Sequence, residues 1–179
     1  MDTISMDAMK AVANLCNQIV LVEYEMILGY PRLIDHLTQF EKIKDKEILD
    51  NLDRLGKDSL GHFSRIDRLM AQFGIPMKWT TNLLPRIVDP IHVLNAQLNK
   101  EREALELYET ARKIVINSKK EAKPRGLISR LFGREKDKEE SVISADEVIF
   151  LLERHKQDEG RHIRLVEDSI ATLKALRKK

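Results

Sequence analysis

Residues 144–170 read SADEVIFLLERHKQDEGRHIRLVEDSI, and apolar positions recur in them every three or four residues from Val148 to Ile170. This spacing places apolar side chains along one face of an α-helix. Ser144 and Glu147 form a capping box, which is typical of the first turn of such a helix. The apolar face is interrupted by three ionisable residues, His155, Glu159 and His162.

Three earlier segments of the chain show the same spacing of apolar residues. Pro31 is expected to end or kink the first helix, because proline has no backbone N–H to donate. A capping box at Thr38 and Glu41 predicts the start of the second helix, and Asp89 followed by Pro90 predicts the start of the third. With the C-terminal segment, the predicted helices span approximately residues 4–36, 41–73, 89–120 and 144–177.

Four long amphipathic helices can bury their apolar faces only against one another, so the sequence predicts an all-α, antiparallel four-helix bundle. A chain of 179 residues, 42% of them apolar, suits one domain over residues 1–179. Residues 119–141 are rich in charge and form a predicted surface insertion between the third and fourth helices. Its apolar segment 126–133 is expected to pack on the bundle or a neighbouring subunit, or to dock on a partner protein or an anionic membrane.

The composition argues against several classes of protein. The 31 Lys and Arg residues are balanced by 29 Asp and Glu residues, which favours no nucleic-acid-binding face. The single Cys16 excludes a disulfide framework, an all-cysteine zinc site and a rubredoxin-type iron centre. The longest uncharged stretch, Ala11–Val22, has 12 residues, whereas a membrane span needs ~20 apolar residues. We therefore expect a cytoplasmic protein.

Each predicted helix carries polar residues in the middle of its apolar face. They are Glu23 in the first helix, Ser59 and His62 in the second, Glu101 in the third, and His155, Glu159 and His162 in the fourth. Burying an unpaired carboxylate costs several kcal/mol, so something in the core has to compensate these charges. A pair of divalent metal ions does so. Glu159 and His162 are spaced Glu-x-x-His, which places an oxygen ligand and a nitrogen ligand one turn apart.

An internal half-repeat points to the same centre. Glu23 and Glu101 are each followed seven residues later by a tyrosine, Tyr30 and Tyr108, so the chain reads as two helical hairpins built on one plan. The core histidine follows the glutamate by 39 residues in the first hairpin and by 61 in the second. The excess of 22 residues is close to the length of the 119–141 insertion.

This pattern resembles the ferritin-like superfamily, and most closely its rubrerythrin, bacterioferritin and manganese-catalase types of di-metal carboxylate protein. The resemblance covers all four helices and excludes the insertion. In that family the first and third helices each supply a terminal Glu, and the second and fourth each supply Glu-x-x-His. The resemblance implies iron or manganese, two ions per chain, and it implies that Tyr30 and Tyr108 orient carboxylates across the bundle. The implied metal ligands are Glu23, His62, Glu101, Glu159 and His162.

One position departs from the family pattern, because the second helix has Ser59-Leu-Gly-His62 in place of Glu-x-x-His. A hydroxyl is an uncharged and poor ligand for a ferrous ion. Asp58 is a candidate for the missing oxygen, and His155 for a further nitrogen. The open possibilities are an asymmetric di-metal site, a mononuclear site made by Glu101 with the Glu-x-x-His pair, and a relic that binds no metal.

The resemblance implies redox chemistry with O2 or a peroxide, of the ferroxidase, peroxidase or oxidase kind. Because the chain cannot form a rubredoxin-type centre, the electrons would come from an iron substrate or from a separate donor. A homo-oligomer, either a dimer or a larger assembly, is expected. The rival interpretation is a non-catalytic helical scaffold or interaction protein with a degenerate metal site, and a diiron hydroxylase is a third that shares the ligands.

Overall fold

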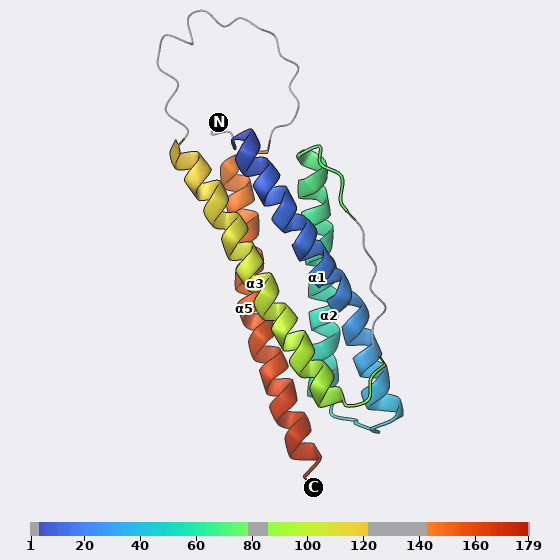
Figure 1. Ribbon diagram of the computed structural model, residues 1–179. Coiled ribbons are helices and arrows are strands. Elements are labelled where there is room, and N and C mark those ends of the chain that lie inside the picture. The colour runs from blue at the N-terminus through green and yellow to red at the C-terminus, as the bar shows by residue number, and fades with distance from the viewer. Residues whose placement is uncertain (1–3, 79–85, 122–142, 179) are drawn as a thin grey trace, which may run out of the picture.

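The protein is described by a computed structural model that covers residues 4–78, 86–121 and 143–178. These residues form no strand and four long α-helices, which pack against one another (Figure 1). The helices are α1 (Met6–Gln39), α2 (Lys46–Gln72), α3 (Pro90–Glu121) and α5 (Ala145–Leu176). The predicted all-α class is therefore confirmed for the described part of the chain.

The helices form two antiparallel hairpins, α1 with α2 and α3 with α5, which lie side by side (Figure 1). α1 packs against α2 and α3, and α5 packs against α3 and α2. α2 ends at the same end of the bundle as α3 does, so the connection from α2 to the start of α3 spans the length of the bundle. Every packed pair of helices is antiparallel in this arrangement.

All four helices contribute apolar side chains to one continuous core. Fully buried examples are Val12, Ile19 and Leu37 of α1, Leu52 and Ile66 of α2, Leu94 and Val115 of α3, and Leu152 and Val166 of α5. Burial of such side chains contributes ~1.5–3 kcal/mol each, which is the main force that holds the hairpins together.

α1 continues through Pro31 to Gln39, past the predicted end near residue 36. Pro31 is exposed, so water can solvate the carbonyl that loses its hydrogen-bond partner. Leu33 and Leu37, beyond the proline, are fully buried and hold the last turns of the helix against the bundle.

α2 begins at Lys46, and the predicted start at residue 41 is wrong. The Thr38 hydroxyl donates to the carbonyl of Ile34 at 2.9 Å inside α1, so it does not cap a new helix. The N-cap of α2 is Asp45, whose carboxylate accepts from the Ile48 amide at 3.2 Å.

The other two helix starts agree with the sequence. Asp89 accepts from the Ile91 amide at 3.1 Å at the start of α3, and the capping box of Ser144 and Glu147 is formed at the start of α5. The predicted insertion 119–141 begins inside α3, which extends to Glu121. The remainder of the insertion, including the apolar segment 126–133, lies outside the described residues.

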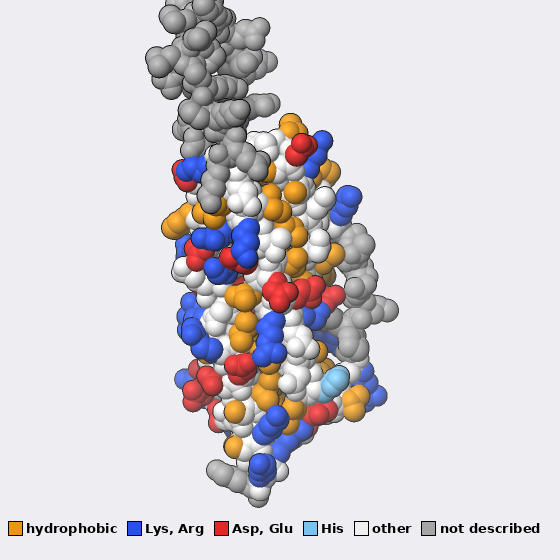
Figure 2. Space-filling view, turned by 60° about the vertical axis from the view of Figure 1, so that its left-hand side comes forward, with side chains coloured by type: hydrophobic (Ala, Val, Ile, Leu, Met, Phe, Trp, Pro, Cys, Tyr) orange, Lys and Arg blue, Asp and Glu red, His pale blue; other side chains and the backbone are white. Residues whose placement is uncertain are grey.

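α1 is long and apolar enough, by length and composition alone, to cross a membrane. The core helix of a bundle passes the same test, and the buried face of α1 packs against α2 and α3. On the face shown in Figure 2, acidic and basic side chains are interspersed with apolar ones.

The capping box of α5 generates a first prediction. The Ser144 hydroxyl accepts from the Glu147 amide at 3.2 Å, and Glu147 accepts from the Ser144 amide at 2.8 Å. Ser144→Ala removes the cap and is expected to lower the free energy of unfolding by about 1 kcal/mol in a urea titration. Thr110→Ala, which removes an exposed hydroxyl from the middle of α3, is the control and should not lower it.

Candidate metal centre

A layer of polar side chains crosses the middle of the apolar core. Seven of these residues are fully buried, with 0% exposed surface. They are Glu23 from α1, Ser59 and His62 from α2, Glu101 from α3, and His155, Glu159 and His162 from α5. The structure therefore brings the five main ligand candidates of the sequence together with Ser59 and His155.

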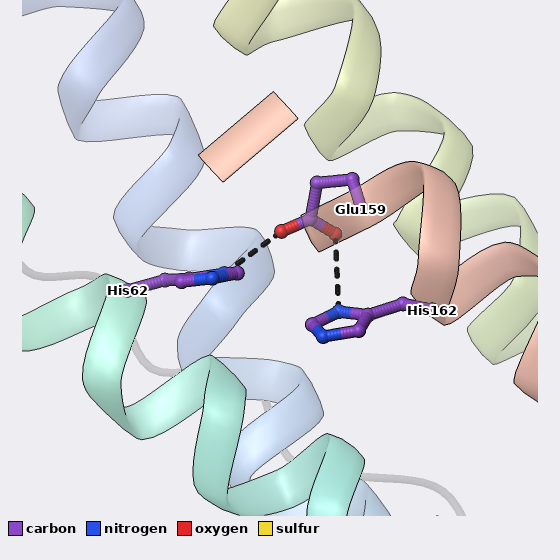
Figure 3. Close-up of side chains that lie close together, drawn as sticks. All are labelled: His62, Glu159 and His162. Carbon is purple, nitrogen blue, oxygen red and sulfur yellow. Dashed lines mark ion pairs between the residues drawn. The ribbon is translucent and has the colours of Figure 1, made fainter. Parts of the chain in front are cut away.

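Glu159 lies between the two imidazoles that flank it, as Figure 3 shows. Its Oε1 is 2.8 Å from Nδ1 of His62, and its Oε2 is 3.6 Å from Nδ1 of His162. The ligand atoms of these three residues all lie within 4.8 Å of one another, so the group could hold a metal ion. One carboxylate thus faces two histidines with a different oxygen toward each.

Each histidine also meets a glutamate from its own hairpin. Nδ1 of His62 is 3.1 Å from Oε1 of Glu23, and Nδ1 of His162 is 3.2 Å from Oε2 of Glu101. The layer therefore consists of two half-sites, His62 with Glu23 and His162 with Glu101, and Glu159 joins them.

Two buried tyrosines fix the outer glutamates, and each comes from the opposite hairpin. The Tyr108 hydroxyl donates to Oε1 of Glu23 at 2.9 Å, and the Tyr30 hydroxyl donates to Oε1 of Glu101. Both phenol groups are fully buried, so these hydrogen bonds satisfy them and restrict the carboxylates. This placement agrees with the orienting role that the family resemblance implies.

Two aspartates that lie outside the core contact the outer nitrogens of the histidines, again across the hairpins. Nε2 of His62 is 3.3 Å from Oδ2 of Asp158, and Nε2 of His162 is 3.2 Å from Oδ2 of Asp58. Arg161 contacts both aspartates, at 2.9 Å from Asp58 and 3.2 Å from Asp158. Each aspartate can accept a hydrogen bond from Nε2–H and thereby aim Nδ1 at the interior.

Asp158 was not singled out from the sequence, and Asp58 was predicted as a candidate for the missing inner oxygen ligand. Asp58 contacts the outer nitrogen of His162 and does not join the inner carboxylates. The signal was present in the chain, because an aspartate precedes each histidine by four residues, in 58–62 and again in 158–162. That spacing puts the aspartate and the histidine on one helix face, but it does not say which histidine the aspartate meets.

His155 lies beside the layer with its Nε2 already engaged. Arg65 of α2 donates its Nε–H to this nitrogen at 2.8 Å. The His155 ring stacks on His62 with centroids 4.4 Å apart and meets Tyr108 edge-on at 5.2 Å. Burial, with the positive charges of His62 and Arg65, lowers the pKa of His155 to about 2, so the ring is neutral and packs against the site.

The buried charges shift the pKa values of the layer strongly. Burial lowers the pKa of the two facing histidines, but their carboxylate contacts outweigh it and raise the pKa to about 10 for His62 and about 11 for His162. Burial and the charges of Glu23 and Glu101 raise the pKa of Glu159 to about 7. Burial acts to raise the pKa of Glu101, but hydrogen bonds, the strongest of them with His162, outweigh burial and lower it. Without a metal, protons on Nδ1 of both histidines offset two of the three buried carboxylate charges, and the raised pKa of Glu159 allows it to take up a third proton near neutral pH.

The same atoms suit metal ions in place of those protons. Oε2 of Glu23 is buried without a hydrogen-bond partner among the described residues, and the two oxygens of Glu159 face only the interior of the layer, in ion-pair contact with His62 and His162. The separations between the facing N and O atoms, 2.8 to 3.6 Å, are near the ~3 Å expected between neighbouring ligands of one ion with bonds of about 2.1 Å. Imidazole nitrogens and carboxylate oxygens are ligands of divalent first-row metal ions, zinc, manganese and iron among them. The donor set therefore fits a metal centre.

Comparison with protein-family profiles, with curated proteins and with solved structures found no match for this chain.

The raised pKa values predict how the stability of the metal-free protein depends on pH. Folded His62 and His162 keep their protons to about pH 10, whereas they lose them near 6.5 in the unfolded chain. The folded state binds more protons in that window, so the free energy of unfolding should fall as pH rises between about 6.5 and 10. Urea titrations at several pH values measure this slope.

The control for this pH dependence is His162→Gln, which cannot be protonated and should flatten the slope. An imidazole of His62 or His162 that titrates near its ordinary pKa in NMR spectra of the metal-free protein would contradict the assignment.

Proposed function

We propose that the protein binds two iron or manganese ions in the layer of His62, His162, Glu23, Glu101 and Glu159, and uses them in redox chemistry with O2 or a peroxide. The observation that carries the proposal is Glu159, which is fully buried and turns one oxygen toward each histidine. A carboxylate in this position can bridge two ions.

The protein's own groups prepare each half-site for a cation. Asp158 and Asp58 accept from Nε2–H of His62 and His162, which leaves the lone pair of Nδ1 directed at the carboxylates. Tyr108 and Tyr30 hold Glu23 and Glu101 by hydrogen bonds, so these carboxylates need little reorganisation when a cation arrives. The Nδ1 protons of the metal-free state are the charges that metal ions would replace.

When bound, such ions supply electrons to an O–O bond, because iron and manganese change oxidation state at an open coordination position. The three carboxylates keep both oxidation states bound by offering hard, negatively charged oxygens. The apolar side chains on the two sides of the layer, with Leu152 and Val166 of α5 as examples, would keep bulk water away from the metal ions.

The topology supports the same family. A ferritin-like bundle has one long crossover connection between two antiparallel hairpins. Here the connection between α2 and α3 spans the length of the bundle, and each hairpin supplies at least one buried Glu and one buried His to the layer. The ferroxidase, peroxidase and oxidase reactions share this ligand set, and the electron source would be an iron substrate or a separate donor.

A non-catalytic scaffold is the second candidate, and the pairing of the buried charges favours it. Both histidines are in contact with carboxylates on each ring nitrogen, so two protonated imidazoles and one proton on Glu159 can neutralise the three buried glutamates without a metal. The two candidates differ in what happens when the central carboxylate is removed.

Removal of Glu159 gives the discriminating prediction. The wild-type chain, loaded anaerobically with Fe(II) or Mn(II), should hold about two ions and gain about 2.7 kcal/mol of stability for each ion at a free metal concentration 100 times Kd. Glu159→Gln should lose the second ion and the part of the gain that this ion supplies. Elemental mass spectrometry and urea titration with and without metal measure these effects.

Glu167→Gln is the matched control, since Glu167 is an exposed glutamate on the same helix that pairs with Arg102, and it should keep its metal. The redox proposal fails if the wild type holds no metal and Glu159→Leu leaves stability unchanged or raises it, because a paired polar core behaves in that way.

The outer aspartates give a further prediction. Asp58→Asn and Asp158→Asn should each weaken metal binding about 10- to 100-fold, because an amide no longer favours the Nδ1 lone pair that faces the interior. Competition with a fluorescent chelator measures the affinity. Asp53→Asn, on the exposed face of α2 where Asp53 pairs with Lys57, is the control, and equal affinities for all three variants would contradict an orienting role.

A further inference from the structure

The contacts of the metal layer occur in matched pairs, with one exception. Asp58 to His162 has its counterpart in Asp158 to His62, and the glutamate and tyrosine contacts are matched in the same way. Ser59 precedes His62 by three residues, as Glu159 precedes His162. Ser59 therefore occupies the position at which the matched arrangement has a second central carboxylate.

His162 has a weaker contact with a central carboxylate than His62 has. His62 Nδ1 lies 2.8 Å from the central carboxylate of the other hairpin, but His162 has no such group opposite it and lies 3.6 Å from Glu159. The Ser59 hydroxyl is fully buried and has no hydrogen-bond partner among the described residues. Ser59 lies one turn before His62 on the same helix face, so the hydroxyl is directed at the layer.

The charges of the buried glutamates and of two divalent metal ions indicate which further ligand would make the proposed metal centre neutral. Glu23, Glu101 and Glu159 carry three negative charges, and the two metal-binding histidines would be neutral. Asp58 and Asp158 are partly exposed and share their negative charges with Arg161 at the edge of the layer. Within the fully buried layer itself, two divalent ions carry four positive charges, so one positive charge is left. One further monoanion neutralises it.

Size limits the choice of monoanion. Serine keeps a hydroxyl oxygen at the place of the glutamate Cγ, so the missing part is the terminal carboxylate, which has the charge and about the size of formate; acetate is one methyl group larger. All seven residues of the layer are fully buried, which favours the smallest carboxylates.

We propose that a small carboxylate anion, of the formate or acetate class, takes the place of the second bridging glutamate and accepts a hydrogen bond from the Ser59 hydroxyl. The inference rests on the proposed metal centre and adds an exogenous ligand to it. Such an anion offers two oxygens, one for each metal ion, as Glu159 does from the other side. The centre is then complete only when metal and anion are both bound.

The proposal is tested by measuring whether the carboxylate anion changes the affinity of the protein for the metal ion. Mn(II) affinity is measured by chelator competition in chloride, formate, acetate and benzoate at equal ionic strength. Formate and acetate should tighten Mn(II) binding about tenfold relative to chloride, and benzoate should not. With Co(II) in place of Mn(II), acetate should also change the visible absorption spectrum, because it enters the coordination sphere.

Variants at position 59 locate the effect. Ser59→Glu supplies the carboxylate from the chain itself, so it should bind Mn(II) in chloride as tightly as the wild type does in acetate, and acetate should have no further effect. Ser59→Ala should reduce the acetate effect, measured as the ratio of Mn(II) affinities in acetate and in chloride. Ser64→Glu adds the same charge to α2 away from the layer and should keep the full acetate response.

The outcomes separate the two proposals. If the wild type binds two Mn(II) ions equally well in all four anions and its Co(II) spectrum is unchanged, the anion inference is overturned and the metal centre stands. If no metal binds under any condition, both are overturned. Should Ser59→Glu fail to fold, the wild type and Ser59→Ala still decide the matter.

Discussion

Three carboxylates and two imidazoles are buried at one level of an apolar core, and the rest of the structure has to keep that arrangement neutral. Charges of one sign cannot be left there alone, since each unpaired buried charge costs several kcal/mol. The bundle meets this constraint by bringing Glu23, Glu101 and Glu159 within contact distance of His62 and His162. Protons or metal ions can then balance the same set of atoms.

Much of this layer could be predicted from the sequence, because helical periodicity determines which side chains point inward. Glu23, Glu101 and Glu159 fall on the apolar stripes of their helices, and all three are fully buried. The half-repeat of Glu and Tyr predicted that two hairpins share one plan, and Tyr30 and Tyr108 occupy corresponding positions in the layer.

What could not be predicted depends on how neighbouring helices are rotated and shifted relative to one another. Asp58 was a candidate for the missing inner oxygen, but the packing of α2 against α5 places it at the outer nitrogen of His162. The bond from Arg65 to His155 joins residues 90 positions apart and has no sequence signal. The start of α2 was missed for a local reason, because the Thr38 hydroxyl bonds back to its own helix and Asp45 provides the cap.

The tyrosine and aspartate contacts of the buried glutamates and histidines all cross between the hairpins: Tyr108 holds Glu23, Tyr30 holds Glu101, Asp158 holds His62 and Asp58 holds His162. Neither hairpin can therefore fix the directions of its own polar core residues. These side chains acquire their final directions only when the two hairpins dock during folding. The polar layer is thus an interface between two halves of one chain, and a single hairpin by itself would carry the glutamate and histidine without the groups that orient them.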